Sequence, residues 1–443
     1  MRRLRLTAAL ALCLTLLSML LLTACTSGNL GSEEIAFVRD GALWTISPDG
    51  TNAFKAVAQD TPVLGYGLSP NHQIFVFRTL DSSFAKTSAA THLVANPITG
   101  LAGDVPSTLN TVGIDGGSSI PIIVSGPHLT HSSAWWSPDG NRLLYREGAS
   151  STMGSPDLVT WIISQDDQPM GIARKSLPGS FSIPSIDARS YLAIGNSALG
   201  IFTTTLAGTN LSYVQRGVLP GHPLPASLER VLWQPAHAKP AILYAIASAA
   251  SPPNSVTLVL RMASGQTHIL TNCACEQFAW SPTGNSVLYS TPQGYTVLTL
   301  SNGAQFHFHT EHDAIPYWSP DGRAILLDGL HTLTLVHVDR QQTQVLLSDG
   351  TAPALSNAPL PNIAAFLQPV ANNLWNVDGQ RFVLVTRGRT QWRGQQLNAG
   401  NGLYTVLLNN SDEPWATPSP VDENGSDIQP GWSYEDPTTS FLF

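Results

Sequence analysis

One five-residue pattern recurs along the chain and constrains its fold more than any other feature. A Trp-Ser-Pro-Asp-Gly segment, or its Thr variant, precedes a short apolar run at Trp136, Trp280 and Trp318. In such a turn Pro presets φ, the Asp side chain caps the turn and Gly supplies a positive φ. Each copy therefore predicts a strand that ends in Trp, a tight turn and a second, apolar strand.

Weaker copies extend this pattern over most of the chain. They begin at Leu68, Ser185, Trp233, Trp375 and Trp432. The well-spaced central copies lie about 38 to 49 residues apart, which is the range of four-stranded propeller blades. One blade cannot bury both faces of its sheet, so blades must stack in a circle. Eight copies predict eight blades; seven is the alternative if the region 350–380 or the copy at Ser185 is misread.

These motifs resemble the WD40-like (PD40), TolB-type propeller repeat, in which Trp-Ser-Pro-Asp-Gly is followed by an apolar strand. The resemblance covers most of residues 35–443. It implies an all-β protein, a single β-propeller of four-stranded antiparallel blades. It also implies a partner-binding module of the cell envelope, although propellers as a class host many functions.

The two ends of the predicted propeller complement each other. Residues 35–38 and 43–46 flank a hairpin turn, but no Trp-bearing strand precedes them. The last copy, at Trp432, has the opposite lack. We therefore expect the N- and C-terminal strands to share one blade, which would leave no open sheet edge there.

The first 25 residues predict the compartment. Three arginines precede the apolar run 6–22, which ends in Leu-Thr-Ala-Cys and resembles a bacterial lipobox. We expect residues 1–24 to be a lipoprotein signal peptide, Cys25 to carry lipid, 25–34 to be a linker and 35–443 the propeller. This predicts an extracytoplasmic protein held to the membrane by lipid. An ordinary signal peptide with a chance cysteine is the alternative.

Composition narrows the possible partners. Without the three signal arginines, 19 basic side chains face 30 acidic ones. Phosphate neutralisation needs a basic surface, so no nucleic acid is expected as a partner. Only 12% of residues are charged, and 36 Gly and 32 Pro suit many short strands joined by turns. We expect a monomer with no cofactor.

The lengths of the predicted connections differ between the two faces of the disc. Long connections are expected between second and third strands, at 79–90, 147–157 and 386–402, and between blades, at 101–130 and 347–362. These two sets emerge on the same face of a propeller. Long loops on a rigid scaffold are the usual place for recognition, although they can also be disordered decoration.

One of these long connections carries an unusual set of side chains. Arg387, Arg389, Trp392 and Arg393 lie together in an otherwise acidic chain. Arg offers forked donors to carboxylate or phosphate, and Trp offers a stacking face. They are the predicted partner-binding residues. The alternative is a solvated loop whose arginines pair with local acids.

Two further groups could bind metal or oxidise. His307 and His309 alternate along a predicted outer strand and could share a metal ion with His312, but such strands usually present polar residues to water. No metal site is assigned. Cys273 and Cys275 could form a strained disulfide at a bend, and a structural role is the better interpretation.

Ser433 lies in a segment that resembles the nucleophile elbow of propeller-bearing serine peptidases. In Gly-Trp-Ser-Tyr-Glu, Glu435 replaces the final Gly of that elbow, and the acid and His that should follow have no chain to occupy. We interpret Ser433 as part of the last blade motif, and we expect no catalytic residues. The sequence predicts a binding or scaffolding lipoprotein for a protein, peptide or glycan. The alternative is a carbohydrate-active lyase or glycosidase with acids and His at the channel mouth.

Overall fold

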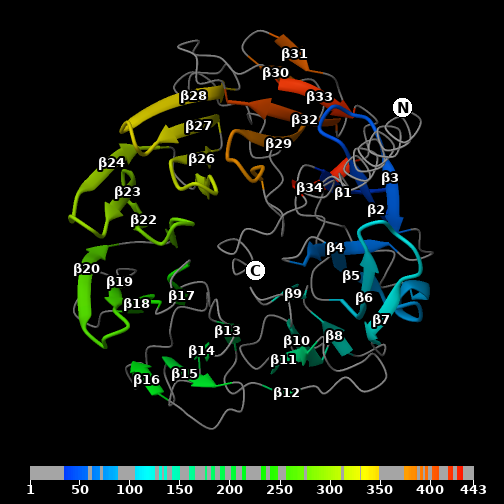
Figure 1. Cartoon of the computed structure of the whole chain (residues 1–443), viewed down its shortest axis with the longest axis horizontal. Helices are drawn as coiled ribbons and strands as arrows, with labels where there is room; N and C mark the ends of the chain where they lie inside the picture. The colour runs from blue at the N-terminus through cyan, green and yellow to red at the C-terminus, as the bar shows by residue number, and fades with distance from the viewer. Residues whose placement is uncertain are drawn as a thin grey trace, which may run out of the picture.

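In the computed structural model of the chain, the strands are arranged in a ring (Figure 1). The structure describes residues between 34 and 432, apart from short stretches in the connections and the longer segments 88–104, 150–158, 165–174, 216–230, 349–373 and 409–417. Within that part of the chain, no helix is long and apolar enough to cross a membrane.

Eight antiparallel sheets of three or more strands follow one another around the ring among the described residues. Sheet 1 contains β34 (Asp427–Trp432), β1 (Ile35–Arg39), β2 (Ala42–Ile46) and β3 (Phe54–Val57), from the axis outwards. Sheet 2 contains β4 (Val63–Leu68), β5 (Ile74–Leu80), β6 (Ser107–Gly113) and β7 (Ile120–Ile123). Sheet 3 contains β8 (Leu129–His131), β9 (Trp135–Trp136), β10 (Arg142–Ala149), β11 (Val159–Ser164) and β12 (Lys175–Ser176).

The next four sheets have four consecutive strands each. Sheet 4 contains β13 (Phe181–Pro184), β14 (Ser190–Ile194), β15 (Ile201–Thr205) and β16 (Ser212–Gln215). Sheet 5 contains β17 (Val231–Trp233), β18 (Ile242–Ala247), β19 (Val256–Arg261) and β20 (Thr267–Cys273). Sheet 6 contains β21 (Phe278–Trp280), β22 (Ser286–Thr291), β23 (Gly294–Thr299) and β24 (Gln305–His309). Sheet 7 contains β25 (Ile315–Trp318), β26 (Ala324–Asp328), β27 (Thr332–His337) and β28 (Gln342–Ser348).

Sheet 8 differs from the others in two ways. It contains β29 (Arg381–Thr386), β32 (Gly402–Leu407) and β33 (Pro418–Asp422). At its inner edge, the described residues contribute a single bridge, from Trp375 to Phe382. The hairpin β30 (Thr390–Trp392) and β31 (Gln395–Leu397) is inserted between β29 and β32 as a separate two-stranded sheet. The all-β propeller fold is confirmed, and a total of eight blades for the complete chain stays a prediction.

The ring closes where the first and last strands meet. β1 pairs with β34 in an antiparallel register that places Ile35 opposite Trp432 and Arg39 opposite Asp427. β1 also pairs with β2 through a two-residue turn in which Asp40 and Gly41 both have positive φ, as a type I′ hairpin requires. The prediction that the two ends of the chain share one sheet is confirmed.

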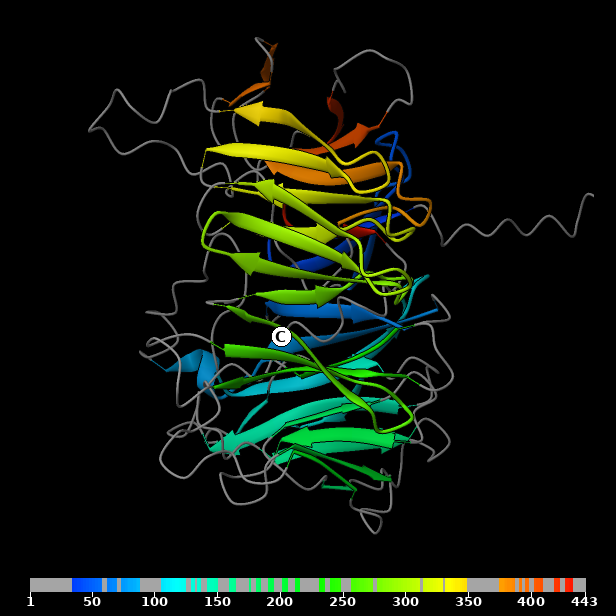
Figure 2. The same ribbon diagram turned by 90° about the vertical axis from the view of Figure 1, so that its left-hand side faces the viewer.

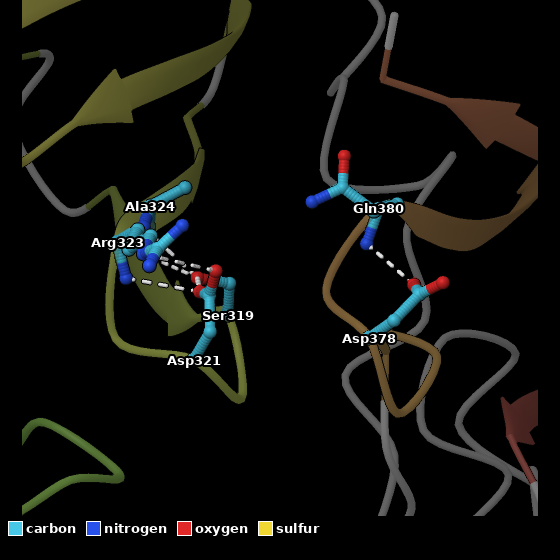
Figure 3. Close-up of polar contacts among 6 residues, drawn as sticks. All are labelled: Ser319, Asp321, Arg323, Ala324, Asp378 and Gln380. Atoms are coloured by element: carbon cyan, nitrogen blue, oxygen red, sulfur yellow. Dashed lines mark hydrogen bonds and ion pairs between the residues drawn. The ribbon is translucent and has the colours of Figure 1, made fainter. Parts of the chain in front are cut away.

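The tight turn of the repeat is held by its own side chains (Figure 3). In sheet 7 the Ser319 hydroxyl accepts the N–H of Ala324 at 2.9 Å and donates to Asp321 at 2.6 Å. The same Asp321 oxygen accepts the N–H of Arg323 at 3.0 Å. Gly322 has φ +70°, a conformation that L side chains rarely adopt. The sequence Ser-Pro-Asp-Gly therefore specifies this turn locally.

A weaker copy of the motif makes equivalent hydrogen bonds through different side chains. In sheet 8 the Asn376 amide oxygen takes the place of the Ser hydroxyl and accepts the N–H of Arg381 at 2.8 Å. Asp378 accepts the N–H of Gln380 at 2.9 Å, as Asp321 does for its own turn (Figure 3). Substitution of Ser by Asn preserves the acceptor, so the turn survives a change in the motif.

The motif tryptophans pack between sheets. Trp318 shares a buried cluster with Val297 of the preceding sheet 6, and Trp375 shares one with Leu335 of the preceding sheet 7. Trp375 also donates its indole N–H to the carbonyl oxygen of Tyr317 at 3.3 Å. The ring of each Trp therefore joins its own sheet to the one before it, as large aromatic side chains do in packed interiors.

One predicted connection was wrong. The segment 101–130 was expected to join two blades, but it contains β6 and β7, the third and fourth strands of sheet 2. The long connection in this sheet is 81–106, between its second and third strands. Gly116, Gly117 and Pro121 made the segment look like a loop, whereas both glycines lie in the β6–β7 turn, each with positive φ.

The connections distribute over the two faces of the disc as strand order requires. Turns between first and second strands and between third and fourth strands lie on one face, which we call the tight-turn face. The opposite, loop-rich face carries the 3-10 turn η1 (Phe84–Lys86), which follows β5, and the hairpin β30–β31 (Figure 2). Most of the predicted connections 147–157 and 347–362 lies outside the described residues.

Candidate functional site

The hairpin β30–β31 carries the residues predicted to bind a partner. Its backbone pairs Thr390 with Leu397 and Trp392 with Gln395. Trp392 is the last residue of β30, at the tip of the hairpin, while Arg387, Arg389 and Arg393 lie outside the described residues. The strands of sheet 8 on either side, β29 and β32, are directly paired with one another. The hairpin is therefore an addition to a complete second and third strand, not part of the sheet itself.

Polar side chains lie buried where the second strands approach the loop-rich face. Arg39, Asp328 and Thr386 are the last residues of β1, β26 and β29, and they are 8%, 2% and 0% exposed. Arg78 of β5 and Glu147 of β10 each lie two residues before the end of their strand. We call these five residues the strand-end layer. Buried polar groups require partners, so the layer shows how the loop-rich face is fixed to the ring.

The Arg39 side chain joins three strands at the closure of the ring. It donates to Asp427 at 2.5 and 2.8 Å and to Asp422 at 2.5 Å. Its guanidinium carbon lies 4.9 Å from the Phe37 ring centre and 5.3 Å from that of Trp44. Burial opposes the charge of the guanidinium, but both carboxylates raise its pKa overall, so Arg39 is permanently charged.

Asp427 is the least exposed of the three charged side chains, so its removal from water costs the most free energy. It is fully buried, and burial raises the pKa of Asp427 although the hydrogen bonds from Arg39 lower it in part. The planar guanidinium of Arg39 donates to both carboxylates at once, so it fixes their distance from β1 and their orientation. This group therefore fixes β34 and β33 to β1 beneath the loop-rich face.

A second buried group centres on His131 in sheet 3. The Nδ1 atom of His131 lies 2.6 Å from the carbonyl oxygen of Ser107, and Nε2 lies 3.1 Å from Glu147. Arg78 donates to the carbonyl oxygen of His131 at 2.9 Å. The His131 ring also meets Tyr145 edge to face, with centroids 5.6 Å apart. Both ring nitrogens thus have partners across sheets 2 and 3.

These contacts define what the His131 group can do. His131 is 0% exposed, whereas the Glu147 side chain keeps 15% of its surface accessible. A His and a Glu in contact are the residue types of acid–base chemistry. A fully enclosed imidazole, however, cannot reach a bound molecule, so the group holds the end of β8 beside Glu147 near the end of β10.

The strand-end layer continues in sheet 7 with Asp328. Tyr317, one strand inwards, has a buried hydroxyl, and burial together with the charge of Asp328 holds the pKa of Tyr317 well above its usual range. The phenol therefore stays protonated at any physiological pH. Like Arg39 and His131, these side chains are enclosed within the ring.

The beginning of one long connection is also ordered by an acid. One carboxylate oxygen of Asp81 accepts the N–H groups of Ser83 and Phe84 at 3.0 and 2.9 Å. Phe84 packs against Leu64 and Leu80 of sheet 2. The chain that follows β5 thus leaves the sheet in a defined direction, over the loop-rich face.

The predicted alternation in β24 is confirmed. His307 and His309 are exposed, whereas Phe308 is buried and Phe306 packs beside it. The Nδ1 atom of His307 lies 2.7 Å from the Thr296 hydroxyl, and that of His309 lies 3.1 Å from the carbonyl oxygen of Gln293. His312 lies outside the described residues, among which no group of three or more metal-ligating side chains occurs.

Several predicted residues lie outside the part of the chain that the structure describes. They include Cys25 with its signal peptide, Cys275 and Ser433. Cys273 ends β20, opposite Val256 in β19. The strand-end layer itself was not predicted. A charged residue directly after four apolar ones, as in Ile-Ala-Phe-Val-Arg, is a signal that would have found Arg39.

Comparisons with known proteins give similarities at low sequence identity. No protein-family model and no curated protein matches the chain. Among solved structures, an oligogalacturonate lyase from Vibrio parahaemolyticus is 8% identical with a TM-score of 0.47, over 85% of this chain and 98% of the other. The C-terminal WD40 domain of Sif2 is 9% identical with a TM-score of 0.46, over 82% and 86%.

A putative TolB from Agrobacterium tumefaciens is 14% identical with a TM-score of 0.33, over 52% of this chain and 83% of the other. The chain is thus a β-propeller by its own sheet arrangement, and TolB-like and WD40-like propellers are among the structures similar to it, as its motif predicted.

Proposed function

We propose that this protein is a lipid-anchored, extracytoplasmic propeller that binds a partner through its loop-rich face and catalyses no reaction. The observation that supports this most is the separate hairpin β30–β31. It is added to a sheet whose second and third strands already pair, so the sheet does not need it. Insertions on rigid scaffolds are characteristic places for recognition.

The buried polar groups support a scaffold beneath that hairpin. Arg39, His131 and Asp427 are enclosed and hold strand ends through side-chain contacts. A binding site built on rigid elements keeps its geometry without a partner. The strand-end layer would therefore present the connections of the loop-rich face in a fixed arrangement.

The chemistry of the hairpin suggests the class of partner. Arg387, Arg389 and Arg393 would donate forked hydrogen bonds to carboxylates, and Trp392 would stack on a sugar ring or an aromatic group. We therefore propose an acidic protein segment, peptide or glycan as the partner. The lipobox ending in Cys25 would keep the protein at the membrane of the cell envelope.

Binding measurements on the full-length lipoprotein test this function. Oligoglutamate peptides and uronic-acid oligosaccharides serve as probes, and titration calorimetry gives the dissociation constant. A variant with Arg387→Ala, Arg389→Ala, Trp392→Ala and Arg393→Ala is expected to bind at least about tenfold more weakly, a loss of about 1.4 kcal/mol. The control variant, Arg261→Ala with Arg340→Ala, removes the arginine that ends β19 and one in the turn after β27, both at the tight-turn face, and should bind like the original chain.

Two results would contradict the proposal. Equal affinity of the hairpin variant and the original chain would exclude the hairpin as the binding element. Turnover of the uronic-acid oligosaccharides by the original chain would instead favour a propeller-type lyase or glycosidase. Urea unfolding of each variant checks that the propeller itself is unchanged.

A further inference from the structure

The register at the ring closure determines where the N-terminal segment leaves the propeller. Ile35 is the first residue of β1 and lies opposite Trp432, the last residue of β34. Tight turns connect first strands to second strands, so the beginning of β1 lies at the tight-turn face. Any tether that precedes Ile35 therefore leaves sheet 1 on the face opposite to the hairpin β30–β31.

The length of that tether limits which face of the disc can approach the bilayer. Ile35 is ten positions after Cys25, a span of at most about 33–36 Å when fully extended. To bring the loop-rich face to the bilayer, the tether would have to pass β2 and β3, about 10 Å, and then run along a five-residue strand, about 17 Å, which uses most of its extended length before any loop is passed. The tight-turn face of sheet 1 needs none of this length.

Exposed apolar side chains occur at the same face. Among the described residues, nine large hydrophobic side chains are exposed. Five of them lie at tight-turn ends of strands or within tight turns: Phe54, Ile120, Met262, Val377 and Leu407. Val124 and Ile315 are exposed at loop-rich ends of strands, so the exit of the tether, rather than the number of exposed side chains, selects the face. Exposed apolar side chains beside such an exit can enter a membrane interface.

Two of these side chains belong to sheets 1 and 2. Phe54 is the first residue of β3 and 43% exposed; Ile120 is the first residue of β7 and 52% exposed. A Cβ on Gly116 would lie 2.8 Å from the Phe54 ring, so the ring lies against the β6–β7 turn that leads to Ile120. The pair forms an apolar edge across sheets 1 and 2.

The charges around this edge indicate which kind of contact it can make. Glu34, Asp49 and Asp115 are acidic, and Lys55 is the basic side chain next to Phe54. Such a surface does not attract an anionic bilayer by charge. A contact here would therefore depend on Phe54 and Ile120 entering the apolar boundary of the bilayer.

We propose that the tight-turn face at sheets 1 and 2 rests on the phospholipid bilayer that holds the lipid anchor, with Phe54 and Ile120 as its apolar contacts. This orientation rests on the proposed anchoring through Cys25. It directs the loop-rich face and the hairpin β30–β31 away from the membrane. The anchor and the binding surface then occupy opposite faces of one rigid ring.

Two labelled positions at opposite ends of β7 test this orientation. Ile120→Cys lies at the tight-turn end, and Val124→Cys, at a residue 67% exposed just after β7, is the matched control. Both are made in the lipidated full-length chain with Cys273→Ser and Cys275→Ser, and labelled with an environment-sensitive fluorophore. The protein is reconstituted in phosphatidylcholine vesicles, with and without phosphatidylglycerol, that contain lipids spin-labelled near the headgroup.

The expected result is several-fold stronger quenching at position 120 than at position 124, equal in both kinds of vesicle. Equal quenching at both positions, or stronger quenching at 124, would overturn the orientation. Quenching at 120 only with phosphatidylglycerol would overturn the apolar contact in favour of an electrostatic one.

Flotation with the vesicles tests the anchor separately. The lipidated chain should float with them, and Cys25→Ala should not. If the original chain fails to float, the proposed anchoring fails together with the orientation. If it floats and the two labels behave alike, only the orientation fails.

Discussion

At the scale of single residues, three charged side chains contact one another where the first and last strands close the ring. Arg39 contacts two acids from strands almost 400 positions away in the chain, and Asp427 is fully buried. Bringing such groups out of water is costly, and the contacts offset that cost only while all of them are present. The group therefore favours one pairing of β1 over any other.

Removal of one member of this group should be strongly destabilising. Asp427→Ala leaves the Arg39 charge buried with a single partner, and we expect the free energy of unfolding in urea to fall by about 3–5 kcal/mol. Arg323→Ala is the control, because its side chain is 75% exposed and lies 3.9 Å from Asp321. That change should cost less than about 1 kcal/mol. Similar costs for both variants would mean that the Arg39 group does not stabilise the closure.

At the scale of elements, the sequence predicted turns better than connections. Ser-Pro-Asp-Gly and its Thr variant specify their turns through contacts within six residues. The strands on either side of the turns after Trp280 and Trp318 could therefore be located correctly. The strands of 101–130 were missed because β6 (STLNTVG) is mostly polar and shows no period-two alternation, and glycines that resemble a loop follow it. Their pairing depends on β5, which no local pattern reveals.

The candidate site was predictable only in part for the same reason. The hairpin carrying Trp392 was expected from the length and composition of 386–402, which are local properties. The contact of His131 with Glu147, Ser107 and Arg78 joins strands from two sheets. Such a group becomes visible only when the register of those strands is known.

Glycines in the tight turns should differ in importance according to what surrounds them. Gly50 and Gly303 both have positive φ, but a Cβ at Gly50 would lie 2.5 Å from the carbonyl oxygen of Val421, whereas Gly303 has open space. Gly303→Ala should cost about 1 kcal/mol from backbone strain alone.

Gly50→Ala adds displacement of β33 from sheet 1 to the same strain. We expect a cost of about 2–3 kcal/mol, measured by thermal and urea unfolding. Equal costs at the two glycines would show that sheets 1 and 8 can separate freely at this point.

At the scale of the whole molecule, buried clusters join neighbouring sheets wherever the structure describes their side chains. One cluster combines residues of sheets 7, 8 and 1, and another combines sheets 1 and 2. The core is thus a chain of interfaces around the axis, and sheet 1 belongs to two of them. Loss of its inner strand should affect both interfaces together.

A chain that ends at Ser426 tests this dependence. Without β34, sheet 1 loses the partner of β1 and the buried Asp427, and we expect loss of a single cooperative urea transition. A synthetic peptide that spans 427–443 should restore that transition when it is added to the shortened chain. An unchanged transition in the shortened chain alone would show that the ring does not need its last strand.

The pairing of β1 with β34 also has a consequence for how the protein is made. β1 pairs with a strand that is synthesised nearly 400 residues later, so sheet 1 cannot be completed until β34 has left the ribosome. Contacts of such long sequence separation slow folding. During translation the edge of β1 would remain unpaired and open to wrong pairing with other strands. Pairing with β34 would end this period.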